Sequence, residues 1–168
     1  INCREFRNRE EAVSRIGRAL ASAEGNTLVF KSPDLMNPDA QNKLARQLST
    51  RILADSSPPR YLPKAKFVGL FGDSIEHLMA QGGLTEKLAS VFAGYPIHVP
   101  PIKDRKQAVL RWAHKMLGQE CTDRSRVMRG FTPDAEKDML SYDWPGNITE
   151  MRQRFVTALD SSDKEWLT

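Results

Sequence analysis

The stretch from Ser141 to Met151 reads Ser-Tyr-Asp-Trp-Pro-Gly-Asn-Ile-Thr-Glu-Met and combines a turn with the start of a helix. Adjacent proline and glycine favour a turn, because proline fixes φ and glycine tolerates left-handed backbone. Asn147 has the residue type of a helix N-cap, and Glu150 follows three positions later, as in a capping box. The apolar residues beyond the turn recur at helical spacing: Ile148, Met151, Phe155 and Leu159. We therefore expect a tight turn followed by an amphipathic helix.

The region around this turn is expected to be helical from residue 103 to residue 168. One amphipathic helix is predicted by the spacing of its apolar residues, which are Val109, Trp112, Ala113, Met116 and Leu117. Residues 118–130 are polar and are expected to form a connection. Thr132-Pro133 then has the pattern of a cap followed by the first residue of another helix.

The N-terminal part alternates helical and extended patterns. A helix is expected over residues 9–22, and Asn37-Pro38 predicts the start of a second helix, whose apolar face is expected to include Leu44, Leu48 and Ile52. Apolar runs predict buried strands at 27–30 and 66–71, and a third strand is expected at 95–99. The fold class is therefore α/β, with an α/β core over 1–102 and a helical subdomain over 103–168.

Composition limits the classes of protein. The 168 residues carry a formal charge of +4, with 40% hydrophobic residues, which is typical of a folded globular chain. No apolar run approaches the roughly 20 residues that a membrane-spanning helix needs. Cys3 and Cys121 are too few for a disulfide framework. We therefore expect a cytoplasmic protein without a membrane partner.

Four stretches together resemble the AAA+ domain of sigma-54-dependent transcriptional activators. Trp144-Pro145-Gly146-Asn147 resembles the family's W-P-G-N, and residues 95–105, Tyr-Pro-Ile-His-Val-Pro-Pro-Ile-Lys-Asp-Arg, are similar to its F-P-I-x-L-P-P-L-R-E-R. Residues 25–30, Gly-Asn-Thr-Leu-Val-Phe, are similar to G-G-T-L-F-L, and residues 83–88, Gly-Leu-Thr-Glu-Lys-Leu, to G-x-F-R-E-D-L. The resemblance covers nearly the whole chain. It implies a partial AAA+-type, P-loop NTPase-like parallel sheet followed by a small helical lid.

The residues that the family uses for nucleotide chemistry differ in this chain. The family's P-loop, G-x-x-x-x-G-K-[ST], precedes a V-N-C that Ile1-Asn2-Cys3 resembles, and no such loop occurs in these 168 residues. The other altered positions are Lys31 and Ser32 for the magnesium-binding acid pair, Gly72 for the sensor I asparagine, Thr85 and Val91 for the arginines that reach a neighbour's nucleotide, and Thr149 for the sensor II arginine.

We therefore expect a degenerate AAA+ domain that is not an enzyme, with no catalytic residue, no cofactor and no metal. A lysine at the metal position repels Mg²⁺, and no carboxylate remains to orient an attacking water. The family's G-A-F-T-G-A loop, which contacts sigma-54, is also absent, because residues 4–24 are predicted to form one plain helix. The expected role is a protein-interaction or regulatory module in bacterial signalling or transcription regulation, with a protein partner or self-association.

Two alternatives remain open. A DNA-associated transcriptional regulator would need a further segment or the basic stretch at 103–129 for nucleic-acid contact. A nucleotide-binding, non-hydrolysing sensor would need a P-loop upstream of Ile1. The resemblance also implies that the P-loop strand lies in the middle of the sheet. We therefore expect an upstream segment or a partner strand to complete the sheet, since open strand edges promote aggregation.

Overall fold

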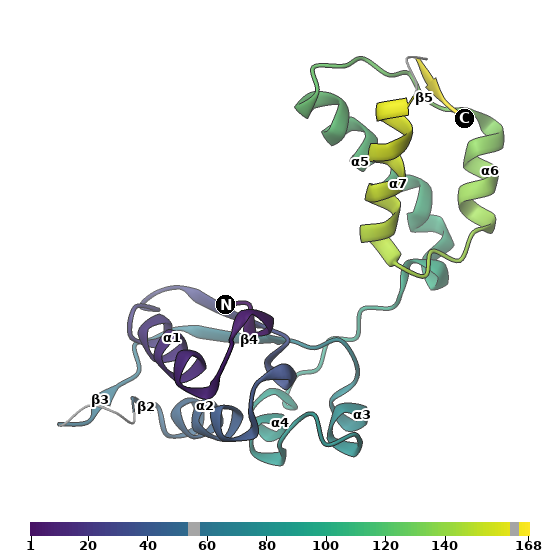
Figure 1. The fold of residues 1–168 in the computed structure, drawn as a ribbon. Coiled ribbons are helices and arrows are strands. Elements are labelled where there is room, and N and C mark those ends of the chain that lie inside the picture. Colours follow the sequence, from purple (N-terminus) through teal and green to yellow (C-terminus); the bar gives the residue numbers. More distant parts are fainter. Residues whose placement is uncertain (54–57, 162–164) are drawn as a thin grey trace. The chain divides into compact units, whose positions relative to one another are not determined.

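The computed structural model describes residues 1–53, 58–161 and 165–168, and it divides the chain into two compact units, Ile1–His98 and Val99–Thr168 (Figure 1). Each unit has its own hydrophobic core. The sequence placed the boundary after residue 102, whereas the structure places it four residues earlier. The physical reason is that Ile102 is completely buried in the core of the second unit.

The first unit contains short helices and strands in alternation. Its elements are η1 (Cys3–Glu5), α1 (Arg9–Ala21), β1 (Thr27–Lys31), η2 (Pro33–Leu35), α2 (Pro38–Thr50), β2 (Ile52–Leu53), β3 (Arg60–Tyr61), β4 (Lys66–Leu70), α3 (Ile75–Ala80) and α4 (Glu86–Phe92). Side-chain caps fix the helix starts: Asn37 accepts from Asp39 N, as expected, and Asn8 accepts from Glu11 N.

A parallel pair, β1 with β4, forms the centre of the first unit. The register runs from Thr27 opposite Lys66 to Lys31 opposite Leu70, as the α/β expectation requires. The first residues of the chain extend this pair, because Asn2 bridges Lys31 in parallel and Lys31 N donates to Ile1 O at 2.8 Å.

The strands are less buried than their apolar runs predicted. In β1 only Phe30 is fully buried, and in β4 Val68 and Leu70 are 40% and 49% exposed. Burial alternates along β4, so one face of this strand packs on the core while the other remains open to solvent.

Three details of the sequence prediction are wrong for the first unit. The expected strand at 95–99 is absent: Tyr95 and Ile97 are 95% and 88% exposed, and no described strand pairs with them. Ile52 does not belong to the apolar face of α2, because the helix ends at Thr50 and Arg51 adopts left-handed backbone. Residues 4–24 do not form one helix, since η1 ends before α1 begins.

The second unit is mainly helical. Its elements are η3 (Ile102–Arg105), α5 (Lys106–Asp123), β5 (Gly130–Phe131), α6 (Pro133–Ser141), α7 (Asn147–Ser161) and β6 (Trp166–Leu167). The predicted polar connection at 118–130 is wrong for its first part, because α5 continues to Asp123. The reason is that Glu120 packs in the interior of the unit, where Arg124 and Arg152 neutralise its charge.

The Trp-Pro-Gly-Asn turn connects α6 to α7 by buried contacts. Trp144 is 4% exposed, and its Nε1 donates to Met139 O at 2.9 Å. The expected N-cap role of Asn147 is wrong: its Oδ1 accepts from Ile102 N at 2.9 Å and so ties the start of α7 to η3. Glu150 retains part of the predicted cap, because its Oε2 accepts from Gly146 N at 2.8 Å.

Candidate functional site

The carboxyl ends of β1 and β4 are the natural candidate site of the first unit. Ligands of open α/β sheets bind outside these strand ends. The structure brings Lys31 and Ser32 together at the end of β1, and Ser32 N donates to Leu70 O at the end of β4. Gly72 follows two residues after β4, so it lies close to the same edge.

Ser32 is buried and already has a partner. It is 5% exposed, adopts left-handed backbone with φ of 53°, and its Oγ accepts from Arg4 Nε at 3.1 Å. Lys31 beside it is exposed. Thus Lys31 and Ser32, the latter bonded to Arg4, occupy the two positions where the family resemblance calls for carboxylates. Hard divalent cations require oxygen ligands, so this edge disfavours Mg²⁺.

Arg4 was not identified from the sequence. It lies in the stretch that was expected to be a plain helix, and its contact with Ser32 spans 28 residues of chain. No periodic pattern marks such a contact. The only available signal is that an arginine follows the Ile1-Asn2-Cys3 strand end, which runs beside β1.

Gly72 offers no side chain to a ligand. A Cβ placed at this residue would meet nothing within 4 Å, and its φ is not in the left-handed region. Glycine is therefore not required here by space or by backbone conformation. Its effect at this edge is the absence of a polar side chain where the resemblance implies asparagine.

Thr85 and Val91 have structural roles in and beside α4. Thr85 is the N-cap, with Oγ1 accepting from Leu88 N at 3.4 Å. Val91 is partly buried against the core of the first unit. Neither can supply the cationic charge that an arginine would bring to a neighbouring molecule.

Gln41 holds the segments that surround this region. It is 1% exposed, and its Nε2 lies 2.9 Å from Met36 O, 2.9 Å from Gly83 O and 3.1 Å from Asp34 O. Its Oε1 accepts from Thr85 N at 2.9 Å. One side chain thus joins η2, α2 and the start of α4. The sequence signal was its spacing with Leu44 and Leu48, which places a polar residue on the apolar face of α2.

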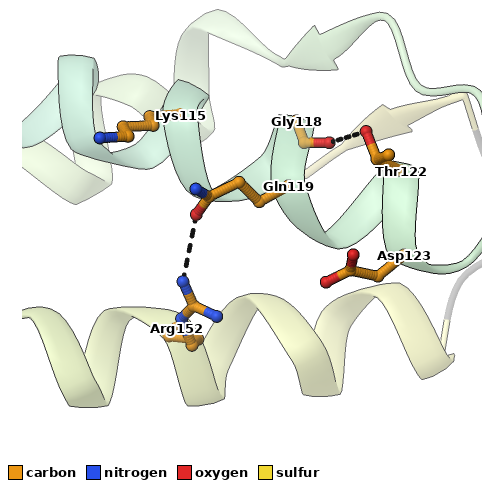
Figure 2. A pocket seen from close by; sticks show the side chains of 6 residues that line it. All are labelled: Lys115, Gly118, Gln119, Thr122, Asp123 and Arg152. Carbon is orange, nitrogen blue, oxygen red and sulfur yellow. Dashed lines mark hydrogen bonds between the residues drawn. The ribbon is translucent and has the colours of Figure 1, made fainter.

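Thr149 belongs to the second unit, where it is exposed in the first turn of α7. The next arginine along α7 is Arg152, and it is engaged within the unit. Its Nη2 donates to Gln119 Oε1 at 3.2 Å and its Nη1 to Glu120 Oε1 at 3.2 Å (Figure 2). Arg152 therefore does not replace the missing sensor arginine without breaking these bonds.

A shallow hollow of about 660 Å³ lies between α5 and α7. Its lining residues are Lys115, Gly118, Gln119, Thr122, Asp123 and Arg152 (Figure 2). The cations here are compensated, because Asp123 belongs to the lining and the Glu120 carboxylate binds Arg152. The hollow therefore presents little net charge to an anionic ligand.

Two perturbed pKa values describe the packing of this chain. Burial raises the pKa of the Cys3 thiol to about 11, so this cysteine is a packing residue with little thiolate character. A hydrogen bond from the Gly146 backbone N–H lowers the pKa of Glu150, with help from Tyr142 and Arg154. Glu150 belongs to the second unit, whereas Cys3 follows Asn2, which bridges Lys31 at the end of β1.

The described residues lack a metal-binding cluster and a membrane-spanning helix. They contain no group of three histidine, cysteine or acidic side chains that could hold a metal ion. None of their helices combines the length and apolar character needed to cross a bilayer.

Comparisons with known proteins show what the chain resembles. No family model matches the chain. HoxA of Cupriavidus necator, a hydrogenase transcriptional regulatory protein, is 29% identical over 144 residues, which are 85% of this chain and 30% of that protein. AnfA of Azotobacter vinelandii, a nitrogen fixation protein, is 24% identical over 146 residues, or 85% of this chain and 27% of AnfA. The chain thus spans about 30% of the length of these relatives.

Solved structures share the fold. NtrX from Brucella abortus matches with a TM-score of 0.83 over 100% of this chain and 41% of NtrX, at 18% identity. NtrX in complex with ATP matches with a TM-score of 0.81 at 20% identity, covering 98% of this chain and 40% of NtrX. The α/β fold with a helical second part is therefore confirmed. The chain resembles the AAA+ domain of sigma-54-dependent transcriptional activators, as the sequence motifs indicated.

Proposed function

We propose that this chain is a catalytically inactive AAA+-like module that acts in bacterial transcription regulation by binding another protein or a second copy of itself. The observation that carries the proposal is the chemistry at the end of β1. Lys31 is exposed there, and Ser32 is occupied by the Arg4 guanidinium. Neither of these two positions supplies a carboxylate for Mg²⁺ or for a water in phosphoryl transfer, which supports the proposal.

The remaining altered positions support the same conclusion independently. Thr85 is used as a helix cap, Val91 packs on a core, and Gly72 has no side chain. Arginine side chains that reach transferred phosphoryl groups are worth orders of magnitude in rate, and neither Thr85 nor Val91 can replace them. The scaffold that positions these residues is intact, so the fold is available for interactions with other macromolecules.

An ATPase assay tests the proposal. We expect no protein-dependent phosphate release from ATP and Mg²⁺ by the 168-residue chain or by a longer protein that contains it. The matched variants are Lys31→Ala and Ser32→Ala, which alter the strand end without adding a carboxylate. Hydrolysis that depends on the protein and disappears in either variant would overturn the proposal.

A protein partner is tested separately. Analytical ultracentrifugation over a range of concentrations measures self-association, and cross-linking in a bacterial cytoplasm captures heterologous partners. We propose a cytoplasmic location, in keeping with relatives that are bacterial regulatory proteins. A monomer at all concentrations that also captures no regulator or transcription protein would contradict an interaction role.

Nucleotide binding without hydrolysis is the second candidate, because NtrX shares the fold and has been solved in complex with ATP and with ADP. Titration calorimetry with both nucleotides separates the two candidates. Heat that saturates with ATP or ADP would favour the sensor. Flat titrations of a protein extended upstream of Ile1 would exclude the sensor and favour the interaction module.

A further inference from the structure

The groove between α2 and α4 is lined by polar and cationic side chains. These helices pack side by side in the first unit, and they bound a hollow of about 660 Å³. Its lining residues are Asn42, Lys43, Ala45, Arg46, Ser49, Thr50, Lys87 and Ser90. Among the described residues, no carboxylate lines this hollow, whereas three cationic side chains do.

The periodicity of the two helices produces this lining. Asn42, Arg46 and Ser49 recur at helical spacing along α2, on the side of the helix away from the buried Leu44 and Leu48. Lys87 and Ser90 are three residues apart on α4 and therefore share one face. The groove is consequently built on two regular helices and not on a loop.

Arg46 and Lys87 are available to a ligand. Both are exposed, and within the described part of the chain neither side chain has a hydrogen bond or an ion pair. Thr50 Oγ1 donates to Arg46 O and Ser90 Oγ donates to Lys87 O, so these hydroxyl groups are held in place at the two walls. Two charged donors thus face an open polar groove whose hydroxyl groups are fixed.

The basic stretch at 103–129, in contrast, is partly neutralised within its own unit. Arg124 pairs with Glu120 and Asp160, and Arg129 pairs with Glu165 at 2.7 Å. Lys115 lies over the ring of Trp112. A stretch that has the highest density of basic residues in the sequence therefore offers less free positive charge than its composition suggests.

We propose that the α2–α4 groove binds the phosphate backbone of a nucleic acid, with Arg46 and Lys87 as the principal contacts. Arginine, lysine, serine, threonine and asparagine are the side chains that contact phosphates and fix the position of a protein on a duplex. An acidic protein segment fits less well, because protein partners usually anchor an aromatic or aliphatic side chain, and Ala45 is the single apolar residue among the described residues of the lining. The described lining residues include no aromatic side chain that could stack on bases, so we expect the contact to be independent of base sequence.

Fluorescence anisotropy with a labelled random-sequence DNA duplex tests the proposal on the 168-residue chain. The groove variant is Arg46→Gln with Lys87→Gln. Its matched control is Arg18→Gln with Lys64→Gln, which removes the same charge from exposed residues elsewhere in the first unit. A third variant, Lys103→Gln with Lys106→Gln, examines the basic stretch of the second unit. Thermal melts confirm that all variants fold.

We expect the groove variant to weaken binding by about tenfold and to reduce the slope of log K against log salt by about two, since each lost phosphate contact lowers it by about 0.9. Both other variants should change binding by less than about twofold. The proposal is wrong if the control variant or the second-unit variant weakens binding as much as the groove variant does. It is also wrong if the unmodified chain does not bind DNA. Displacement of the duplex by polyglutamate, with polyglutamate binding that requires Arg46 and Lys87, would likewise overturn it in favour of an acidic protein segment.

Discussion

Replacement of Gln41 by leucine should destabilise the first unit strongly. Leucine has a similar volume but removes the carboxamide that joins η2, α2 and the start of α4. Gln41 has two N–H groups among three carbonyls at 2.9–3.1 Å, and one oxygen that accepts from Thr85 N. At least three hydrogen bonds are therefore lost.

The magnitude follows from the net value of these bonds. Each contributes about 0.5–1.5 kcal/mol, and a buried group left without a partner costs about 1–3 kcal/mol. The Met36 carbonyl bond is buried, whereas those to Asp34, Gly83 and Thr85 are partly accessible to water. We therefore expect Gln41→Leu to lower the free energy of unfolding by about 3 kcal/mol, which is a large part of the stability of a small unit.

Urea denaturation followed by far-ultraviolet circular dichroism measures this loss. The matched control is Gln81→Leu, because Gln81 is exposed and its side chain is hydrogen-bonded to the ring of His77. Its effect should stay within about 0.5 kcal/mol, as for most surface substitutions. Hydrogen exchange adds a local measurement, since the amide of Thr85 should exchange faster in Gln41→Leu. A Gln41→Leu variant as stable as the Gln81→Leu variant, with unchanged exchange at Thr85, would refute the reasoning.

Three further predictions concern separate parts of the chain. In native protein near pH 8, a thiol reagent should modify the partly exposed Cys121 and spare Cys3, whose pKa of about 11 leaves only about one thiolate in a thousand; two reactive thiols before unfolding would contradict this. Because the pKa of Glu150 is lowered in the folded protein, its contribution to stability is present above the ordinary glutamate pKa and is lost as pH falls through the lowered value. Glu150→Gln should therefore flatten the acid limb of a curve of stability against pH. An unchanged acid limb would count against this prediction. The amides of Phe67 and Gly69 point away from β1, because Lys66 N and Leu70 O bond toward that strand. A strand from an upstream segment or a partner should therefore protect these two amides from hydrogen exchange. Fast exchange of both amides in a longer protein would argue against completion of the sheet.

Local patterns predicted the positions of most elements. The predicted caps at Asn37 and Thr132 depend on residues within a few positions, and their hydrogen bonds confirm both. The strand expected at 95–99 was wrong because a strand exists only where a neighbour pairs with it, and an apolar run does not reveal the neighbour. The apolar content of Tyr95 and Ile97 was therefore no guide to their burial.

The candidate site was predictable in its residues but not in its contacts. Lys31, Ser32 and Gly72 could be placed at strand ends from the motif alignment alone. The Arg4–Ser32 hydrogen bond and the Gln41 contacts to Gly83 and Thr85 span 28, 42 and 44 residues, so no local rule foresees them. The N-cap prediction for Asn147 was wrong for the same reason, because the backbone N–H of Ile102, 45 positions earlier, binds its side chain.

The hydrogen bond between Asn147 and Ile102 gives the Trp-Pro-Gly-Asn turn a structural role that is independent of any nucleotide. Its polar atoms are used inside the unit: the indole of Trp144 holds the end of α6, and the carboxamide of Asn147 holds the backbone where the chain enters the unit. Selection for correct folding alone would therefore be enough to preserve this stretch in the inactive module that we propose. This turn therefore reports the fold and not ATP hydrolysis, whereas the residues that end β1 bear directly on the chemistry.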